Sequence, residues 1–170
     1  MKTSPRTLLL LLLCMAYTAI SAQLSMPRAS STYWRDSIPQ AMRQSYIAYG
    51  AQYAGQPWPT IPDSVFGEFK RTGNRAHYER LCFQKRTRLA ALALAEIIEG
   101  KGRFIPDLKR GLENLFSEPW WGIPAHYRHD RPLSTDQNVD LFNAETAGLV
   151  AWINYMLGEA LGSDLRQTID

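Results

Sequence analysis

The sequence predicts an all-α protein made of successive antiparallel helix hairpins. In its long segments, apolar residues recur every three or four positions, which is the spacing of one helix face. No segment alternates apolar and polar residues convincingly, as a half-buried strand would. Glycines and prolines separate the helical segments, so short turns are expected to return each helix along its neighbour.

Residues 1–22 have the three-part pattern of a secretory signal peptide. Basic residues at Lys2 and Arg6 precede an apolar stretch over residues 8–20, and small residues end the segment at Ala22. The apolar stretch is 13 residues long, shorter than the ~20 that a membrane-spanning helix needs. We therefore expect cleavage near Ala22, no membrane span afterwards, and a secreted or periplasmic protein.

Charge and cysteine content limit the expected partners. The formal net charge is +3, and it falls to +1 without Lys2 and Arg6. Such a chain lacks the basic footprint of a nucleic-acid-binding protein, so no nucleic acid is expected. Cleavage would leave only Cys82, which is expected to be a buried, inert thiol without a disulfide partner. Lipid attachment at Cys14 is a minor alternative, because Leu13 occupies a position that normally holds Gly or Ala.

Residues 23–62 are expected to form an N-terminal helix and a proline-rich connector. The helix is predicted over residues 37–54, with a capping serine, a proline in its first turn and a glycine after its end. Three prolines among residues 56–62 exclude a helix there and predict an extended connector. An aromatic stripe follows one face of the helix, and we interpret it as core packing: Met42, Tyr46, Tyr49 and Tyr53.

The remaining helices are predicted within residues 63–170. A short helix is expected over residues 63–72, and the longest one over residues 75–99, whose alanines and apolar residues surround it on several sides. Two glycines end this long helix. A further helix over residues 105–116 is then expected to return antiparallel and complete a hairpin.

An aromatic loop over residues 117–141 is the main candidate for function. It is 25 residues long, and loops of this length are usually functional or flexible. A helix over residues 144–161 follows, capped by Asn143, and another helix begins behind Ser163. Because this last helix has no C-cap and its neighbours are apolar on several sides, we expect the helical array to continue beyond Asp170.

Two motifs occur in order along this loop and the helix after it. They read Trp121-Gly-Ile-Pro-Ala-His126 and Asp140-Leu-Phe-Asn-Ala-Glu-Thr-Ala147. Both resemble motifs in the N-terminal part of heparinase II/III-like polysaccharide lyases, and the resemblance extends over roughly residues 75–170. A weaker resemblance to chondroitin lyases lies at Trp120-Trp121-Gly-Ile-Pro124. The resemblance implies that residues 63–170 are a partial (α/α) toroid domain, incomplete at its C-terminus.

The resemblance also implies eliminative cleavage of acidic, uronate-containing polysaccharides. Such an enzyme neutralises the uronate carboxylate, removes the neighbouring carbon-bound proton with a Tyr or His, and protonates the departing oxygen, without a cofactor. In the family these groups lie mostly later in the toroid. No catalytic residue is therefore assigned, whether the chain is itself an enzyme stays open, and the chain alone is expected to be inactive.

Trp120, Trp121 and His126 are the candidate substrate-binding residues. Indole rings stack on pyranose faces, and an imidazole forms hydrogen bonds with sugar hydroxyls. In the alternative interpretation, one tryptophan fills a gap between hairpins, the other is partly exposed, and His126 bonds a helix end. No metal is expected at His126, His129 and Asp130, because a loop does not fix these ligands rigidly.

Two other functions stay open at this point. The first is a complete small secreted all-α module that binds a glycan or a protein without catalysis. The second is a toroid glycoside hydrolase, which needs two carboxylic acids facing each other, and Glu118 and Asp130 are the best local candidates. If the array is incomplete, the terminal helices should expose an apolar flank.

Overall fold

A computed structural model of the chain describes residues 26–127 and 139–169. Within these ranges every regular element is a helix and there is no β-strand, so the predicted all-α class is confirmed. The predicted signal peptide, His129 and Asp130 lie outside the described residues. Among the described helices, none combines the length and the apolar character that crossing a membrane requires.

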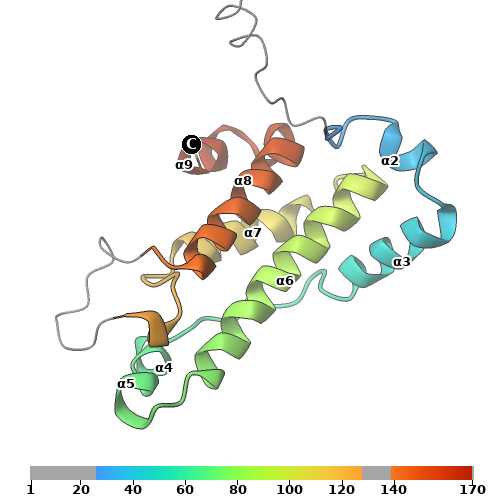
Figure 1. Cartoon of the computed structure of the whole chain (residues 1–170). Helices are drawn as coiled ribbons and strands as arrows, with labels where there is room; N and C mark the ends of the chain where they lie inside the picture. The colour runs from blue at the N-terminus through green and yellow to red at the C-terminus, as the bar shows by residue number, and fades with distance from the viewer. Residues whose placement is uncertain (1–25, 128–138, 170) are drawn as a thin grey trace, which may run out of the picture.

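Helix α6 (Ala76–Glu99) lies at the centre of the fold (Figure 1). Helix α3 (Gln40–Ala51) lies along one side of it and α8 (Leu141–Leu161) along the other, while α7 (Ile105–Phe116) contacts both α6 and α8. The C-terminal half of α6 is buried on several sides, as its alanine-rich sequence predicts. Its buried apolar residues are Leu89, Ala91, Leu92, Ala93, Ala95, Ile97 and Ile98.

Short helices complete the described fold. The predicted helix over residues 63–72 is two helices that meet at Gly67, a residue that weakens a helix because it lacks a side chain. A further short helix, over Tyr33–Asp36, was not predicted. The short elements are α2 (Tyr33–Asp36), α4 (Asp63–Phe66), α5 (Glu68–Thr72), the 3-10 helix η1 (Pro124–His126) and α9 (Ser163–Ile169).

The predicted core packing of the aromatic stripe is wrong for its three residues on α3, whereas Tyr53, just after the helix, is partly buried and packs against the core. Met42 is 49% exposed, Tyr46 40% and Tyr49 41%, so this face points to solvent. The helix also begins later than predicted, at Gln40, because Pro39 occupies the N-cap position. Its first turn thus starts after the proline rather than around it.

The opposite face of α3 packs against α6 through small residues. Gly50 is buried, and a Cβ atom there would overlap the Cβ of Ala95 and lie 2.8 Å from the carbonyl oxygen of Ala91. The two backbones can approach this closely only because Gly50 has no side chain. Close backbone contact, rather than aromatic packing, therefore joins α3 to the core.

The proline-rich connector is extended, as predicted, and it is fixed to the core by Arg88. The Arg88 guanidinium lies 3.9 Å from the centroid of the Trp58 ring and donates to the carbonyl oxygens of Gln56 and Pro57 at 2.5 and 2.9 Å. On the other side, Gly111 of α7 lies so close that a Cβ there would overlap the Trp58 indole. The connector is thus held between α6 and α7.

The turn between α6 and α7 is organised by Glu96. This residue lies on the buried face of α6, and its carboxylate accepts hydrogen bonds from the N–H groups of Gly102 at 2.6 Å and Phe104 at 2.9 Å. Gly100 and Gly102 have φ values of 65° and 74°, which L-residues with side chains rarely adopt. The predicted glycine break is therefore confirmed.

Helix α8 exposes an apolar flank, as expected for the terminal helices. Leu141 is 84% exposed, and a hollow of about 290 Å³ lies farther along the helix. Small and aromatic residues line this hollow: Met26, Gly148, Ala151, Trp152 and Tyr155.

Candidate functional site

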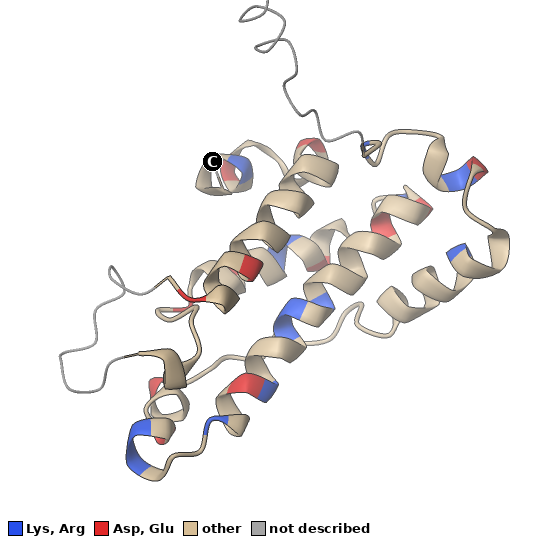
Figure 2. Ribbon diagram, in the orientation of Figure 1, with Lys and Arg blue, Asp and Glu red and all other residues tan. Residues whose placement is uncertain are grey.

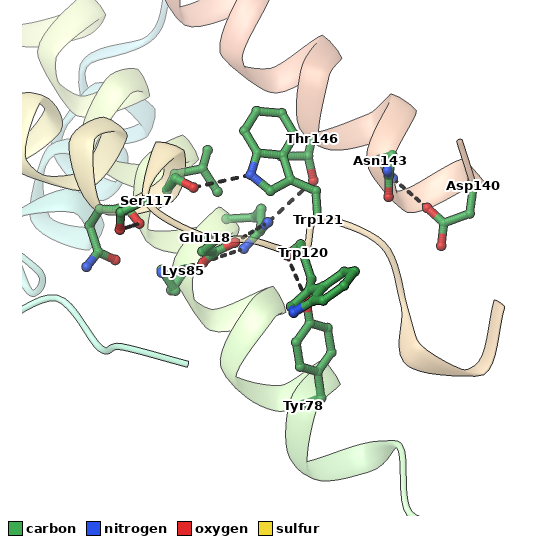
Figure 3. Close-up of polar contacts among 12 residues, drawn as sticks. Tyr78, Lys85, Ser117, Glu118, Trp120, Trp121, Asp140, Asn143 and Thr146 are labelled. Carbon is green, nitrogen blue, oxygen red and sulfur yellow. Dashed lines mark hydrogen bonds and ion pairs between the residues drawn. The ribbon is translucent and has the colours of Figure 1, made fainter. Parts of the chain in front are cut away.

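Two of the predicted site residues, Trp120 and Trp121, lie where the segment after α7 meets the start of α8 (Figure 3). Trp120 and Trp121 lie just after α7, and His126 is the last residue of η1. Helix α8 begins at Leu141, and its N-cap is Asp140. The predictions that Asn143 caps this helix and that it starts at residue 144 are therefore wrong.

Asp140 joins the two motifs of the loop and the helix. One carboxylate oxygen accepts from the Asn143 N–H at 2.7 Å, which caps α8. The other accepts from the Ile123 N–H at 3.0 Å and lies 2.6 Å from Nδ1 of His126. Burial by itself would raise the pKa of Asp140, but these hydrogen bonds outweigh it and lower the pKa below its ordinary value. Asp140 is thus an ionised carboxylate at neutral pH.

His126 is oriented by this carboxylate. Because an ionised carboxylate only accepts hydrogen bonds, Nδ1 of His126 is the nitrogen that donates, which leaves Nε2 as the other polar atom of the ring. The side chain is 45% exposed, and no described residue forms a hydrogen bond with Nε2. His126 therefore presents a fixed ring to solvent, and its role in substrate binding stays a prediction.

Trp120 belongs to an aromatic cluster with Phe66 and Tyr127. Its ring stacks on Phe66 with centroids 4.7 Å apart and planes 15° apart, and its edge meets Tyr127. The hydroxyl of Tyr78 donates to the Trp120 carbonyl oxygen at 2.9 Å. The indole is half-buried, so one ring face serves packing.

Trp121 is also half-buried, but it packs on the main core. Its indole N–H donates to the Leu115 carbonyl oxygen at 3.2 Å, and its ring lies nearly parallel to that of Phe116. The two tryptophans therefore point into different clusters and do not form one continuous stacking surface. Each retains a partly exposed region, and contact with substrate stays a prediction for both.

A small polar hollow lies beside Trp121. It measures about 170 Å³ and is lined by Pro119, Trp121, Tyr127 and Asn143. Gly122 is required here, because a Cβ would lie 2.7 Å from both the Tyr127 hydroxyl and the Asn143 side-chain oxygen. Burial raises the pKa of Tyr127, although hydrogen bonds to the Gly122 backbone and the Asn143 side chain act in the opposite direction. The phenol is thus neutral at ordinary pH.

A buried ionic cluster beside this region was missed from the sequence. Glu118 forms an ion pair with the Lys85 ammonium (Figure 3). On its other side, NH1 and NH2 of the Arg86 guanidinium donate to the two Glu118 oxygens at 3.2 and 2.8 Å. The basic residues lie halfway along α6 (Figure 2). One signal was available, since Lys85 falls on the same helical stripe as Tyr78 and Cys82.

Glu118 does not fit the role of a glycosidase acid that its sequence position suggested. Its side chain is only 6% exposed and both of its oxygens bond to cations. A hydrolytic acid must reach the glycosidic oxygen of a bound sugar. Glu118 is better explained as the counter-ion of Lys85 and Arg86.

Metal ligation and thiol chemistry find no support in the described region. No three His, Cys, Asp or Glu side chains within residues 26–127 and 139–169 are placed to hold a metal ion. Cys82 is fully buried, as predicted, and burial raises its pKa to about 11. A thiol with such a pKa is largely protonated and unreactive near neutral pH.

Comparisons with known proteins assign no family, because no family model and no curated protein sequence matches the chain.

Proposed function

We propose that this chain forms the opening helices of an (α/α) toroid polysaccharide lyase of the heparinase II/III-like type, in which it binds acidic, uronate-containing glycan. In this proposal α6 and α7 form one antiparallel hairpin of the toroid, and α8 begins the next. One observation supports it above the others. The two motifs that resemble the lyase family meet at the Asp140 carboxylate, which bonds to the Ile123 N–H, His126 and the Asn143 N–H.

The contribution of this chain would be binding rather than bond cleavage. Trp121 offers the exposed part of its ring to a pyranose face, and the oriented His126 offers Nε2 to a sugar hydroxyl. The nearby cluster of Lys85, Arg86 and Glu118 has one more positive than negative charge, which favours the approach of an anionic polymer. Removal of the uronate proton and departure of the glycosidic oxygen are assigned to no residue of this chain.

Calorimetric titration of the full chain with acidic and neutral oligosaccharides tests this proposal. We expect binding to oligouronates that weakens with added salt, and little binding to uncharged oligosaccharides of equal length. Trp121→Ala and His126→Ala should each weaken oligouronate binding by about 5- to 10-fold, the loss expected for one stacking contact or one hydrogen bond. Tyr46→Ala is the matched control, because it removes an exposed ring from the distant α3 face.

Three results would contradict the lyase-type binding role. These are equal affinity for neutral and acidic oligosaccharides, an unchanged affinity in a folded Trp121→Ala variant, and absence of all oligouronate binding. Absorbance of unsaturated uronate ends gives a separate readout. We expect the chain alone to produce none.

A small secreted binding module is the second candidate, and the exposed aromatic face of α3 favours it. Met42, Tyr46 and Tyr49 expose 40% or more of their surface along one helix. Sequencing the gene past the Asp170 codon separates the two candidates. A continuing frame that encodes further helix hairpins supports the lyase proposal, whereas an immediate stop codon supports the module.

A further inference from the structure

A groove of about 320 Å³ lies between α6 and α8, separate from the hollow beside Trp121. Its volume is at the lower end of the range for ligand pockets, which suits one sugar ring rather than a large ligand. The residues that define its chemistry are Phe83, Arg86, Thr87, Phe142, Glu145 and Thr146.

We propose that this groove binds a single uronate residue and that Arg86 bonds to its carboxylate. The choice of an acidic glycan as ligand rests on the proposed function. The groove itself is a different place, because Asp140, where the two motifs meet, does not line it. Three features support this site: a net positive charge on the buried cluster, unused donors on Arg86, and an apolar wall beside polar rim groups.

The positive charge comes from the buried ionic cluster, whose member Arg86 lines the groove. Lys85, Arg86 and Glu118 have side chains that are 1%, 8% and 6% exposed, and together they hold two positive charges and one negative charge. A buried charge without a counter-ion is unfavourable in a medium of low polarity. A ligand carboxylate bonded to Arg86 would balance the net positive charge of these three residues.

Arg86 is the member of the cluster that lines the groove, and it has donors to spare. A guanidinium has about five N–H groups. Arg86 directs one from NH1 and one from NH2 to Glu118, and its Nε–H to the Thr146 hydroxyl at 3.4 Å. Among the described residues, no contact uses the second N–H of NH1 or of NH2. A carboxylate is the acceptor that matches such a planar pair of donors.

The walls of the groove favour a sugar over a simple anion. Phe83 is 46% exposed, and its ring meets that of Phe142 edge-on with centroids 5.1 Å apart. An exposed phenyl face suits the C–H face of a pyranose. Thr87 and Glu145 are exposed side chains of the lining, and they are suited to sugar hydroxyls. The Glu145 carboxylate repels anionic groups in the groove, so a ligand with one carboxylate directed at Arg86 is favoured over a heavily sulfated one.

Nuclear magnetic resonance titration of the isotope-labelled full chain with monomeric glucuronate tests the site. We expect the backbone amide signals of Phe83, Thr87 and Thr146 to shift with glucuronate and to stay unchanged with glucose. Phe83→Ala should weaken glucuronate binding by about 2- to 10-fold, because one ring contact is lost. Tyr33→Ala is the matched control and should leave this binding unchanged, because it removes an exposed ring on α2 that is not part of the groove lining. Arg86→Lys should weaken it further, and Phe83→Ala provides the test if Arg86→Lys does not fold.

Each possible result decides between defined alternatives. Shifts with glucose equal to those with glucuronate would overturn the role of Arg86. Equal shifts with acetate would overturn the assignment of a sugar. If oligouronates bind but shift only signals near Trp120, Trp121 and His126, the groove proposal fails while the proposed function stands. If no oligouronate binds anywhere, both fail.

Discussion

In the C-terminal half of α6, the buried side chains of residues 89–98 are alanines and branched apolar groups apart from Glu96, and Gly50 of α3 lies directly against Ala91 and Ala95. In the N-terminal half, the buried side chains are instead a tyrosine, a thiol and the cations Lys85 and Arg86. The C-terminal half is stabilised mainly by burial of apolar surface and by close fit between side chains. The stability of the N-terminal half depends on polar partners from distant positions in the chain, such as Glu118 and Thr146.

This difference determines how each half should respond to a substitution. Loss of one apolar group costs the transfer free energy of that group plus the free energy of any cavity that is left behind. Loss of one member of a buried ion cluster costs more, because the remaining charge stays buried without a partner.

Glu118→Gln should lower the free energy of unfolding by about 3–5 kcal/mol, because it leaves Lys85 and Arg86 buried without a counter-ion. Urea unfolding followed by circular dichroism measures this change. Glu113→Gln is the matched control, since Glu113 is exposed on α7 and its replacement should alter the value by less than ~0.5 kcal/mol. A loss below ~1 kcal/mol in Glu118→Gln would mean that water reaches and screens the cluster.

Gly50→Ala should lower the free energy of unfolding by about 1–3 kcal/mol, because the new methyl group overlaps Ala95 and forces α3 away from α6. The same measurement on Gly148→Ala supplies the control. A Cβ at Gly148 meets no neighbouring atom within 4 Å, so this change should raise stability by up to ~1 kcal/mol through helix propensity. A stabilising effect at Gly50 would show that the two helices are not in close contact.

Asp140→Asn should lower the free energy of unfolding by about 1 kcal/mol at neutral pH, because the charged cap of α8 is lost. The folded pKa of Asp140 lies below its ordinary value, so its stabilisation is complete above the unfolded pKa of about 4. It is lost as pH falls through the folded pKa. Urea unfolding at about pH 7 and pH 3 should therefore show a smaller difference between variant and wild type at the lower pH. An equal difference at both values would contradict the lowered pKa.

Tyr46→Ala should change the free energy of unfolding by less than ~0.5 kcal/mol, because the ring lies on the exposed face of α3. Thermal unfolding is sufficient to check this. Tyr78→Ala is the buried comparison, since Tyr78 is 2% exposed and its loss should cost about 3–5 kcal/mol. A large effect at Tyr46 would mean that the α3 stripe has a packing partner.

The sequence predicted the apolar half of α6 and the turn after it well, because burial there follows the helical period and glycines mark the end. It did not predict which face of α3 is buried. At Gly50 the facing surface of α6 includes Ala91 and Ala95, and the two backbones approach so closely that a side chain at this position would overlap them. Residue type alone does not reveal the shape of the partner helix.

The site was predicted only in its composition. Trp120, Trp121 and His126 do lie near one another in the chain, but their orientations depend on Phe66, Leu115 and Asp140, which periodicity does not connect to them. The start of α8 was placed late for a related reason. Both Asp140 and Asn143 are good capping residues, and only the three-dimensional contacts of Asp140 decide between them.

Cys82 gives the polar half of α6 a built-in reporter of local opening. Its thiol is fully buried, so a maleimide or disulfide reagent can react only when this part of the helix separates from its neighbours. In a chain with Cys14 replaced by Ser, it would be the only reactive sulfhydryl. The labelling rate of Cys82 would then measure how often this region opens while the alanine-rich half remains closed.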